Sequence, residues 1–477
     1  MSQPNVVIVL VDELRSFEVG CYGNDVIRTP HMDALAAEGA MFGNAVTNNP
    51  VCSPARACVL SGQYGRTTTG SLTNDCMDPC SDERKHFPDV TLPEIFKSRG
   101  YRTAIIGKWH LDPPPDTMGF DESCFPLNIH RHYGQTYIDN GQWTDPIEKF
   151  GPDYELDKVN AFLDARVEDD EPFFLYYNIS PPHEPIGPLE LPERYVTMYD
   201  PEDVIIRDNA YVDGVLAYDW DWFKMYLIWG YWWRIAKTGL WDADPRCGYP
   251  GQVGNLSSDD ELCPEDYTLK DLTAAYYGAT TCCDDLLGRL RQMLADKGFD
   301  ENTIIVFASD HGDNLGSHGL FNKDCLYEEA IRIPLMFHDP RRIAPVRNDK
   351  QIAGLIDIAP TLLDMLEIDV PDHIAGRSLV PTFESSDATL EDNASFIECN
   401  AGILGRATVG VRTETHTYGR WLEEDGKTLG EAWGFFDLRT DPYQQRNLLE
   451  TGEQSELAAE LHTRVAEQHH AIAWLGD

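Results

Sequence analysis

The sequence predicts an α/β fold with a large mixed, mostly parallel sheet and helices on both faces, followed by a small C-terminal antiparallel sheet subdomain with a terminal helix. Short β-branched apolar runs alternate with segments of helical pattern, at 5–11, 102–107, 172–179 and 303–308. After about residue 385, alternating apolar and polar residues replace this pattern at Ala407–Arg412, His416–Trp421 and Trp433–Leu438. We therefore expect a catalytic α/β domain at 1–385 and an antiparallel subdomain at 386–477.

Helix start signals lie between these strands. Thr29 and Pro30 supply an N-cap and an N1 proline for a helix over 30–39, and Thr91 to Glu94 form a capping box for a helix over 92–99. Periodic apolar residues predict further helices over 267–297, Ile358–Leu366 and 454–474.

Composition excludes several classes of protein. Hydrophobic residues at 42% and charged residues at 25% of 477 residues exclude a disordered chain, a collagen and a coiled coil. Eighty acidic against 38 basic side chains give a formal charge of −42, which repels nucleic acid and anionic membrane surfaces. We expect no nucleic-acid partner.

Location is predicted from the apolar segments and the cysteines. The chain enters a strand at once, without the basic and apolar regions of a signal peptide. The longest apolar run elsewhere, the Trp-rich segment 220–241, is interrupted by Lys224, Gly230 and Arg234, which is too often for a membrane span. These features predict a cytoplasmic enzyme whose twelve cysteines are mostly reduced thiols. Cys247 with Cys263, or Cys76 with Cys80, could pair in an exported protein.

Polar residues follow the carboxyl end of each predicted parallel strand. In open α/β sheets, ligands bind in the crevice outside these strand ends. One site should therefore gather side chains from four strands, which are Asp12 and Glu13, Lys108 and His110, His183, and Asp310 with His311.

The residue types at these strand ends indicate a metal and an anionic substrate. Three carboxylates and the His311 imidazole suit Ca²⁺, Mg²⁺ or Mn²⁺ better than a structural zinc ion. Lys108, His110, His183 and Lys323 add positive or proton-donating groups to the same rim. A metal combined with cationic side chains is typical of sites that transfer a phosphoryl or sulfuryl group.

The segment Cys52-Ser53-Pro54-Ala55-Arg56 resembles the signature of the sulfatase family, in which the cysteine is oxidised to formylglycine. The resemblance extends along most of the chain. It includes Gly107-Lys108-Trp109-His110, Pro181-Pro182-His183, Ser309-Asp310-His311-Gly312, His318 through Lys323 to Glu329, and Asp437 to Pro442. It implies an alkaline-phosphatase-like fold, a sulfate monoester substrate, either small or a saccharide, and a formylglycine-generating enzyme as a maturation partner.

The chemistry of sulfate esters explains this modification. A serine or cysteine nucleophile would be left as a stable sulfated adduct that water removes slowly. A hydrated aldehyde carries two hydroxyls, so one attacks sulfur and the other later expels sulfate by elimination. Pro54 pre-sets a helix start, which places residue 52 at a helix N-terminus, where backbone N–H groups favour anions.

The resemblance also assigns roles to individual residues. Formylglycine from Cys52 would be nucleophile and metal ligand, with Arg56 holding its hydrate. Asp12, Glu13, Asp310 and His311 would complete the metal site. Lys108 and Lys323 would neutralise the sulfate oxygens, His110 would accept the proton of the elimination step, and His183 would protonate the leaving oxygen. His318 is either a supporting residue or merely structural.

Two pairs depart from the common family pattern. Many calcium sulfatases carry Asp-Asp and Asp-Asn, where this chain has Asp12-Glu13 and Asp310-His311. Ca²⁺ is therefore the first expectation and Mn²⁺ the alternative. Phosphonate monoester hydrolases are similar at the same pairs, so a phosphonate monoester hydrolase or phosphodiesterase is the alternative function. An inactive relative that binds sulfated ligands is the remote one.

Residues 220–241 contain six of the eleven tryptophans. The segment is either a stacking platform for a sugar or aryl group or an aromatic cage for a quaternary ammonium. A buried apolar patch or a homo-oligomer interface is the more common explanation of such a run.

Overall fold

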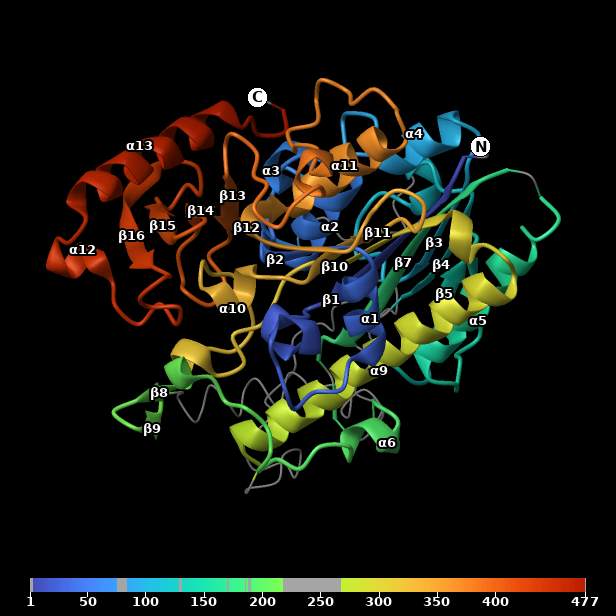
Figure 1. Ribbon diagram of the computed structural model, residues 1–477, viewed down its shortest axis with the longest axis horizontal. Coiled ribbons are helices and arrows are strands. Elements are labelled where there is room, and N and C mark those ends of the chain that lie inside the picture. The colour runs from blue at the N-terminus through green and yellow to red at the C-terminus, as the bar shows by residue number, and fades with distance from the viewer. Residues whose placement is uncertain are drawn as a thin grey trace.

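The computed structural model describes residues 3–74, 84–127, 131–169, 171–184, 186–187, 190–217 and 267–476. A ten-stranded sheet in the order β12-β2-β11-β10-β1-β7-β3-β4-β5-β6 forms the centre of the molecule (Figure 1). The five central strands β10, β1, β7, β3 and β4 are mutually parallel, whereas β11, β5 and their neighbours introduce antiparallel pairs. The predicted mixed, mostly parallel sheet is confirmed.

The strands of this sheet are β1 (Asn5–Asp12), β2 (Ala40–Val46), β3 (Arg102–Gly107), β4 (Glu122–Pro126), β5 (Tyr137–Asp139), β6 (Gln142–Trp143), β7 (Phe173–Pro182), β10 (Thr303–Ser309), β11 (Leu335–His338) and β12 (Val346–Gly354). Its helices are α1 (Pro30–Glu38), α2 (Cys52–Ser61), α3 (Gly65–Thr68), α4 (Leu92–Ser98), α5 (Gly151–Asp164), α6 (Glu193–Val196), α9 (Leu269–Asp296), α10 (Glu328–Ile331) and α11 (Ile358–Met365). A two-stranded ribbon, β8 (Tyr211–Val212) and β9 (Val215–Leu216), lies apart from the sheet.

Helices cover both faces of the sheet because alternate residues of its central strands are buried on opposite sides. In β1, Val6, Ile8 and Leu10 pack in a core with α2, α4 and α11. Val7 and Val9 pack in a second core with α1, α5 and α9 on the other face (Figure 1). Every residue of β1 is buried, as expected for a central strand of a sheet covered on both sides.

The C-terminal subdomain is a four-stranded antiparallel sheet, β13 (Ala394–Cys399), β14 (Thr408–Thr413), β15 (His416–Leu422) and β16 (Leu429–Asp437). Helix α13 (Ser455–Ala471) packs on it, after the short helix α12 (Leu448–Thr451) (Figure 1). The antiparallel sheet and the terminal helix are confirmed, and β13 adds a strand that the sequence pattern did not indicate.

Two predicted helix starts have different outcomes. The capping box of Thr91 and Glu94 is present at α4. Thr29 does not cap α1 with its side chain, because its hydroxyl donates to Asp33 Oδ1 at 3.2 Å and accepts from the Gly20 amide at 2.8 Å. Thr29 occupies the N-cap position before Pro30 as predicted, but its side chain makes no capping hydrogen bond.

In the part of the chain that the structure describes, no helix combines the length and apolar character needed to cross a membrane. The Trp-rich segment 220–241 and the cysteines Cys76, Cys80, Cys247 and Cys263 lie outside the described residues.

Candidate active site

Four neighbouring parallel strands carry polar side chains at or just after their carboxyl ends, on the same side of the sheet. Asp12 is the last residue of β1, Asp310 and His311 follow β10, Lys108 follows β3, and His183 follows β7. All five are buried. Parallel pairing of these strands brings residues almost 300 positions apart into contact, as the Glu13 amide that donates to Asp310 Oδ1 at 3.0 Å shows.

A glycine sets the turn that carries Lys108. Gly107 has a φ of +92°, and a Cβ at this position would lie 1.9 Å from the carbonyl oxygen of Asn178 on the neighbouring strand. Only glycine fits this left-handed turn against the next backbone. After this turn, the Lys108 ammonium donates to Asp12 Oδ2 and lies 3.7 Å from Cys52 Sγ.

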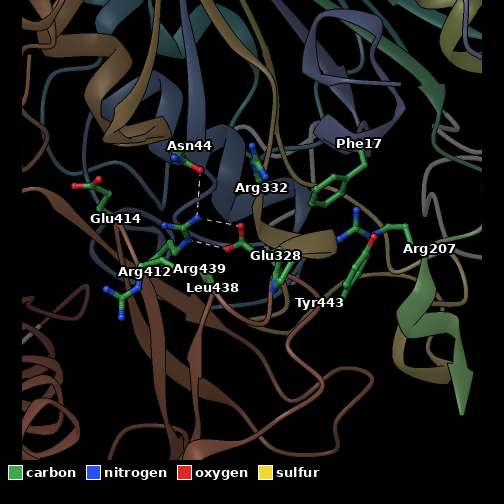
Figure 2. A pocket seen from close by; sticks show the side chains of 11 residues that line it. Phe17, Asn44, Arg207, Glu328, Arg332, Arg412, Glu414, Leu438, Arg439 and Tyr443 are labelled. Carbon is green, nitrogen blue, oxygen red and sulfur yellow. Dashed lines mark hydrogen bonds and ion pairs between the residues drawn. The ribbon is translucent and has the colours of Figure 1, made fainter. Parts of the chain in front are cut away.

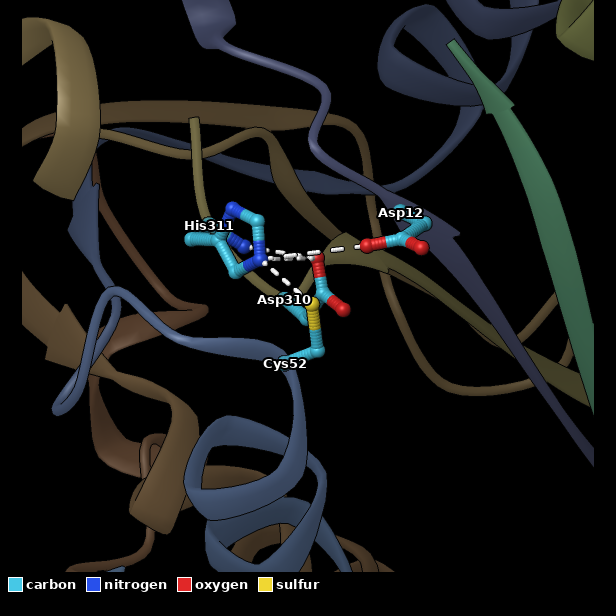
Figure 3. A group of neighbouring side chains, drawn as sticks. All are labelled: Asp12, Cys52, Asp310 and His311. Carbon is cyan, nitrogen blue, oxygen red and sulfur yellow. Dashed lines mark hydrogen bonds and ion pairs between the residues drawn. The ribbon is translucent and has the colours of Figure 1, made fainter. Parts of the chain in front are cut away.

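Four potential metal ligands converge, namely Asp12, Cys52, Asp310 and His311 (Figure 3). One ligand atom from each lies within 4.8 Å of the others, and all four residues are buried. The His311 Nε2 atom is 3.2 Å from Cys52 Sγ, 3.6 Å from Asp310 Oδ1 and 3.8 Å from Asp12 Oδ1. Two carboxylates, an imidazole and the residue-52 side chain thus form a donor set of the kind that binds a divalent cation.

The hydrogen bonds around this cluster leave metal-binding atoms available. Nδ1 of His311 donates to the Gly312 carbonyl at 3.0 Å, which leaves Nε2 with a lone pair facing the cluster. Burial lowers the pKa of His311, so the imidazole is neutral at physiological pH. Asp12 Oδ1 is buried and accepts no hydrogen bond. A buried carboxylate oxygen without a donor is costly, and a cation would satisfy it.

Arg56 holds the second aspartate in place. Its side chain is fully buried and donates through Nη2 to Asp310 Oδ2 at 2.9 Å and through Nη1 to the Lys108 carbonyl at 3.0 Å. One guanidinium therefore ties the β10 end of the site to the β3 end. We find Arg56 beside the metal cluster, one helical turn after Cys52 on α2.

Glu13 lies in a neighbouring cluster instead of with the other four predicted ligands. Its Oε2 accepts a hydrogen bond from Lys323 Nζ at 2.9 Å and is 3.1 Å from His183 Nε2. Burial and the adjacent carboxylate of Glu184 raise the pKa of Glu13 well above its usual value. Ligation of a metal by Glu13 stays a prediction, because the structure groups it with His183 and Glu184.

The two predicted proton-transfer residues have different surroundings. His183 is buried, with Nδ1 2.7 Å from the Glu184 carbonyl and Nε2 3.1 Å from Lys323 Nζ. His110 is only partly buried, and its backbone has a φ of +55°. Its carbonyl accepts a hydrogen bond from Ser53 Oγ at 2.8 Å, which joins the loop after β3 to the residue next to Cys52.

Cys52 is the first residue of α2, as the proline signal predicts, with Val51 as N-cap. Fewer backbone N–H groups are free at this helix start than expected, because the Ser53 amide donates to Asn74 Oδ1 at 2.9 Å and Pro54 has no N–H. Burial and the nearby Asp12 raise the pKa of the Cys52 thiol to about 11. Cationic side chains, more than helix amides, must therefore attract an anion here.

Two other residues complete the description of the site. His318 stacks on Tyr327 at 3.7 Å, and its Nε2 is 3.1 Å from Asn209 Nδ2, so it belongs to a structural network beside the site. Glu184 was not predicted from the sequence, although it lies next to His183 and its carboxylate is 3.5 Å from His183 Nδ1. Its position directly after a predicted site residue was the available signal.

The chain is similar to known proteins over most of its length. A family model described as sulfatase matches residues 4–368, and a model described as N-sulphoglucosamine sulphohydrolase, C-terminal, matches residues 316–471. An ulvan-active sulfatase of Formosa agariphila is 31% identical over 98% of this chain and 82% of its own length. An N-acetylglucosamine-6-O-sulfatase of Bacteroides thetaiotaomicron is 27% identical over 96% of this chain and 85% of its own length.

Solved structures share the fold. A protein solved in complex with its substrate D-glucosamine-2-N,6-O-disulfate superposes with a TM-score of 0.76 at 24% identity, covering 98% of both chains. A phosphonate monoester hydrolase of Agrobacterium radiobacter superposes with a TM-score of 0.66 at 21% identity, covering 98% of this chain and 96% of its own.

Proposed function

This chain belongs to the sulfatase family, and we propose that it hydrolyses a sulfate ester carried by a saccharide, with formylglycine made from Cys52 as nucleophile and one divalent cation. The position of Cys52 carries this proposal. Its Sγ atom is buried at a helix start, 3.2 Å from His311 Nε2 and 3.7 Å from Lys108 Nζ, within the metal-binding cluster. The saccharide substrate is inferred from relatives named for activity on ulvan and on N-acetylglucosamine-6-O-sulfate.

Charge balance around Cys52 favours an anionic substrate. Three buried carboxylates are matched by three buried cations, which are Asp12, Glu13 and Asp310 against Arg56, Lys108 and Lys323. A divalent cation bound to this set leaves a net positive charge in a water-poor site. Such a charge attracts a sulfate ester and stabilises the oxygens on sulfur as the transition state forms.

Formylglycine would supply a hydrated aldehyde, of which one hydroxyl attacks sulfur while the other allows sulfate to leave by elimination. Lys108, beside Cys52, is placed to neutralise a sulfate oxygen. Arg56 fixes Asp310 and the Lys108 backbone, and so keeps the ends of β10 and β3 in register around the nucleophile. The His110 carbonyl accepts a hydrogen bond from Ser53, the residue after Cys52, and we propose that the His110 imidazole accepts the proton of the elimination step.

The leaving oxygen needs a proton, and His183 is the proposed donor. Its Nδ1 points to the Glu184 carbonyl at 2.7 Å, and its Nε2 lies 3.1 Å from both Glu13 Oε2 and Lys323 Nζ. Lys323 is held in turn by Glu13 at 2.9 Å. Glu13 thereby positions the acid and the lysine together, in addition to its proposed role toward the metal.

Ca²⁺ is the proposed ion and Mn²⁺ the alternative, because the His311 imidazole is softer than an amide oxygen at the same place. Metal content measured by mass spectrometry separates these ions. Loss of the metal in Asp310→Ala supports the ligand set, whereas full metal content in that variant would sink it.

The decisive test measures kcat/KM with an aryl sulfate, a 6-O-sulfated N-acetylglucosamine and an aryl phosphonate monoester on one preparation. The mass of the Cys52 peptide must show formylglycine, which we propose is installed by a formylglycine-generating enzyme. Cys52→Ala is the blank, and Cys58→Ala, a second buried cysteine on α2, is the matched control. Preference for the sulfates, lost only in Cys52→Ala, supports the proposal.

A phosphonate monoester hydrolase is the second candidate. The Asp310-His311 pair is the feature that favours it, because His311 Nε2 directly faces the nucleophile position. A kcat/KM for the aryl phosphonate monoester above that for every sulfate ester would favour phosphonate monoester hydrolysis over sulfate ester hydrolysis.

A further inference from the structure

A cavity of about 310 Å³ lies between α10 and the C-terminal subdomain (Figure 2). Four arginines line it, namely Arg207, Arg332, Arg412 and Arg439. This concentration of positive side chains contrasts with the formal charge of −42 on the chain. Its volume is at the lower end of the range for small-molecule sites and exceeds the space that a bare ion needs.

Three of these arginines already have carboxylate partners. Arg412 forms a two-pronged ion pair with Glu328, at 2.8 and 3.1 Å, and Arg207 binds Glu329 at 2.7 Å. Arg439 binds Asp437 at 2.7 Å from a side chain that is 58% exposed. The first pair joins α10 to β14, the second joins α10 to the segment before β8, and the third is local to the end of β16.

Arg332 is the exception. Its Nε and Nη2 donate to the Gly43 carbonyl, at 2.9 and 2.6 Å, and its guanidinium lies 5.3 Å from the Phe17 ring. Within the described part of the chain, no carboxylate lies within ion-pairing distance of it. Burial lowers the pKa of Arg332, the nearby carboxylate of Glu328 partly offsets this, and the neighbouring cation Arg412 lowers the pKa further. Both oxygens of Glu328 accept hydrogen bonds from Arg412, so Arg332 and Arg412 share one carboxylate. A bound anion would supply the second negative charge to this pair of guanidiniums.

The remaining acidic group on the wall does not neutralise Arg332. Glu414 lies at the rim and forms an ion pair with Lys350 at 3.2 Å. Arg207 lies between the rings of Phe17, 3.6 Å from its guanidinium carbon, and Tyr443, 4.8 Å away (Figure 2). The Phe17 and Tyr443 rings hold the Arg207 guanidinium between them and form an aromatic wall of the cavity.

We propose that this cavity is a second binding site, which takes one oxyanion group, a carboxylate or a sulfate, of an acidic saccharide at Arg332 and Arg439. The anionic oxygens would bind the unused N–H groups of Arg332 on the floor, and Arg439 would reach them from the exposed rim. The cavity volume favours a sugar unit over a free ion as the carrier of the charge.

The site is distinct from the active site. Helix α10 contacts the active-site side through the Ala330 carbonyl, which accepts a hydrogen bond from the amide of Gly312, next to His311. Glu328 and Arg332 face the cavity on the other side. Binding here therefore does not depend on Cys52 or on the proposed hydrolysis.

Glucuronate is a suitable probe, since it carries a carboxylate on a sugar but no sulfate ester to be hydrolysed. Calorimetric titration of the Cys52→Ala protein with glucuronate should show binding, and glucose should show none. Arg332→Gln should weaken glucuronate binding at least tenfold and Arg439→Gln several-fold. Arg406→Gln, which removes an exposed arginine of the same subdomain, should leave it unchanged.

A structural measurement keeps the proposal testable if Arg332→Gln does not fold. Crystals of the Cys52→Ala protein soaked in sodium selenate should show an anomalous peak beside Arg332, and this peak should disappear in Arg439→Gln. Selenate at the active site alone, together with unchanged glucuronate affinity in Arg439→Gln, would overturn the proposal. Selenate beside Arg332 without any glucuronate binding would show an adventitious ion only and would also overturn it.

Discussion

Replacing Arg56 by methionine tests whether one buried guanidinium holds the metal cluster together. Methionine has a similar volume but no charge and no hydrogen-bond donor. The side chain of Arg56 is fully buried, and it donates to Asp310 Oδ2 and to the Lys108 carbonyl. Arg56→Met therefore leaves both acceptors without this donor.

The magnitude follows from what remains around Asp310. Removing one partner of a buried ion pair costs about 3–5 kcal/mol, because the other charge stays buried and unpaired. Asp310 Oδ1 keeps two amide donors, from Glu13 at 3.0 Å and His311 at 2.9 Å, so the lower end of this range applies. We expect Arg56→Met to lose about 3 kcal/mol of unfolding free energy without metal, and less with metal, since a cation beside Asp310 replaces part of the lost charge.

Urea unfolding followed by tryptophan fluorescence, in chelator and in saturating Ca²⁺, measures both values. Arg102→Met is the matched control, because Arg102 forms its ion pair with Glu171 at the surface, where both side chains are about half exposed. Its urea midpoint should not change. An Arg56→Met midpoint equal to that of Arg102→Met, or a loss that Ca²⁺ does not reduce, would refute the reasoning.

Three further predictions concern single residues. The unconverted Cys52 thiol has a pKa of about 11, so only about one molecule in a thousand should be thiolate at pH 8. Iodoacetamide should therefore alkylate it slowly, and the rate should rise about tenfold per pH unit up to pH 10. A rate that does not depend on pH, measured from the mass of the Cys52 peptide, would contradict this. Asp310→Ala should lose at least half of the bound metal while keeping its far-ultraviolet circular dichroism, and an unchanged spectrum with full metal would contradict the ligand assignment. Burial raises the pKa of Glu155 from 4.5 to about 8, so the folded state binds an extra proton and stability should fall by about 4 kcal/mol as pH rises from 4.5 to 8. Glu155→Gln, which keeps the acceptor for the Tyr137 hydroxyl, should flatten this slope in urea titrations, and a slope equal to that of the wild type would exclude Glu155 as its source.

The central strands and the long helices could be predicted because their sequences are consistent with one structure at every level. The runs that became β1, β3, β7 and β10 are mostly apolar and almost entirely buried, as expected for strands covered on both faces. The edge strand β12 and its neighbour β2 could not be predicted in the same way. β12 mixes exposed and buried residues, and β2 contains glycine and asparagine, so its pairing with β11 and β12 depends on tertiary contacts.

The sequence predicts which residue types follow the strand ends at the candidate site. It does not predict how these side chains divide into separate clusters. The strand ends predict Asp12, Asp310 and His311 together, the resemblance to the sulfatases predicts Cys52 beside them, and the structure groups these four. The separation of Glu13 from this group depends on its positive φ of 62° and on Lys323, which approaches from a distant loop. Neither is visible in a linear pattern. The cytoplasmic location and the role of residues 220–241 stay predictions.

The position of β1 between β7 and β10 fixes when the active site can form during synthesis on the ribosome. Cys52 and His311, 3.2 Å apart in the folded protein, are separated by 259 residues. At roughly 5–20 residues per second, the ribosome needs about 15–50 seconds to make that stretch. During this interval β1 lacks one of its two neighbours and the Cys52 sulfur cannot yet be enclosed. Once β10 is in place, Cys52 is only 1% exposed, so another protein that oxidises its sulfur has readier access to the nascent chain than to the folded one.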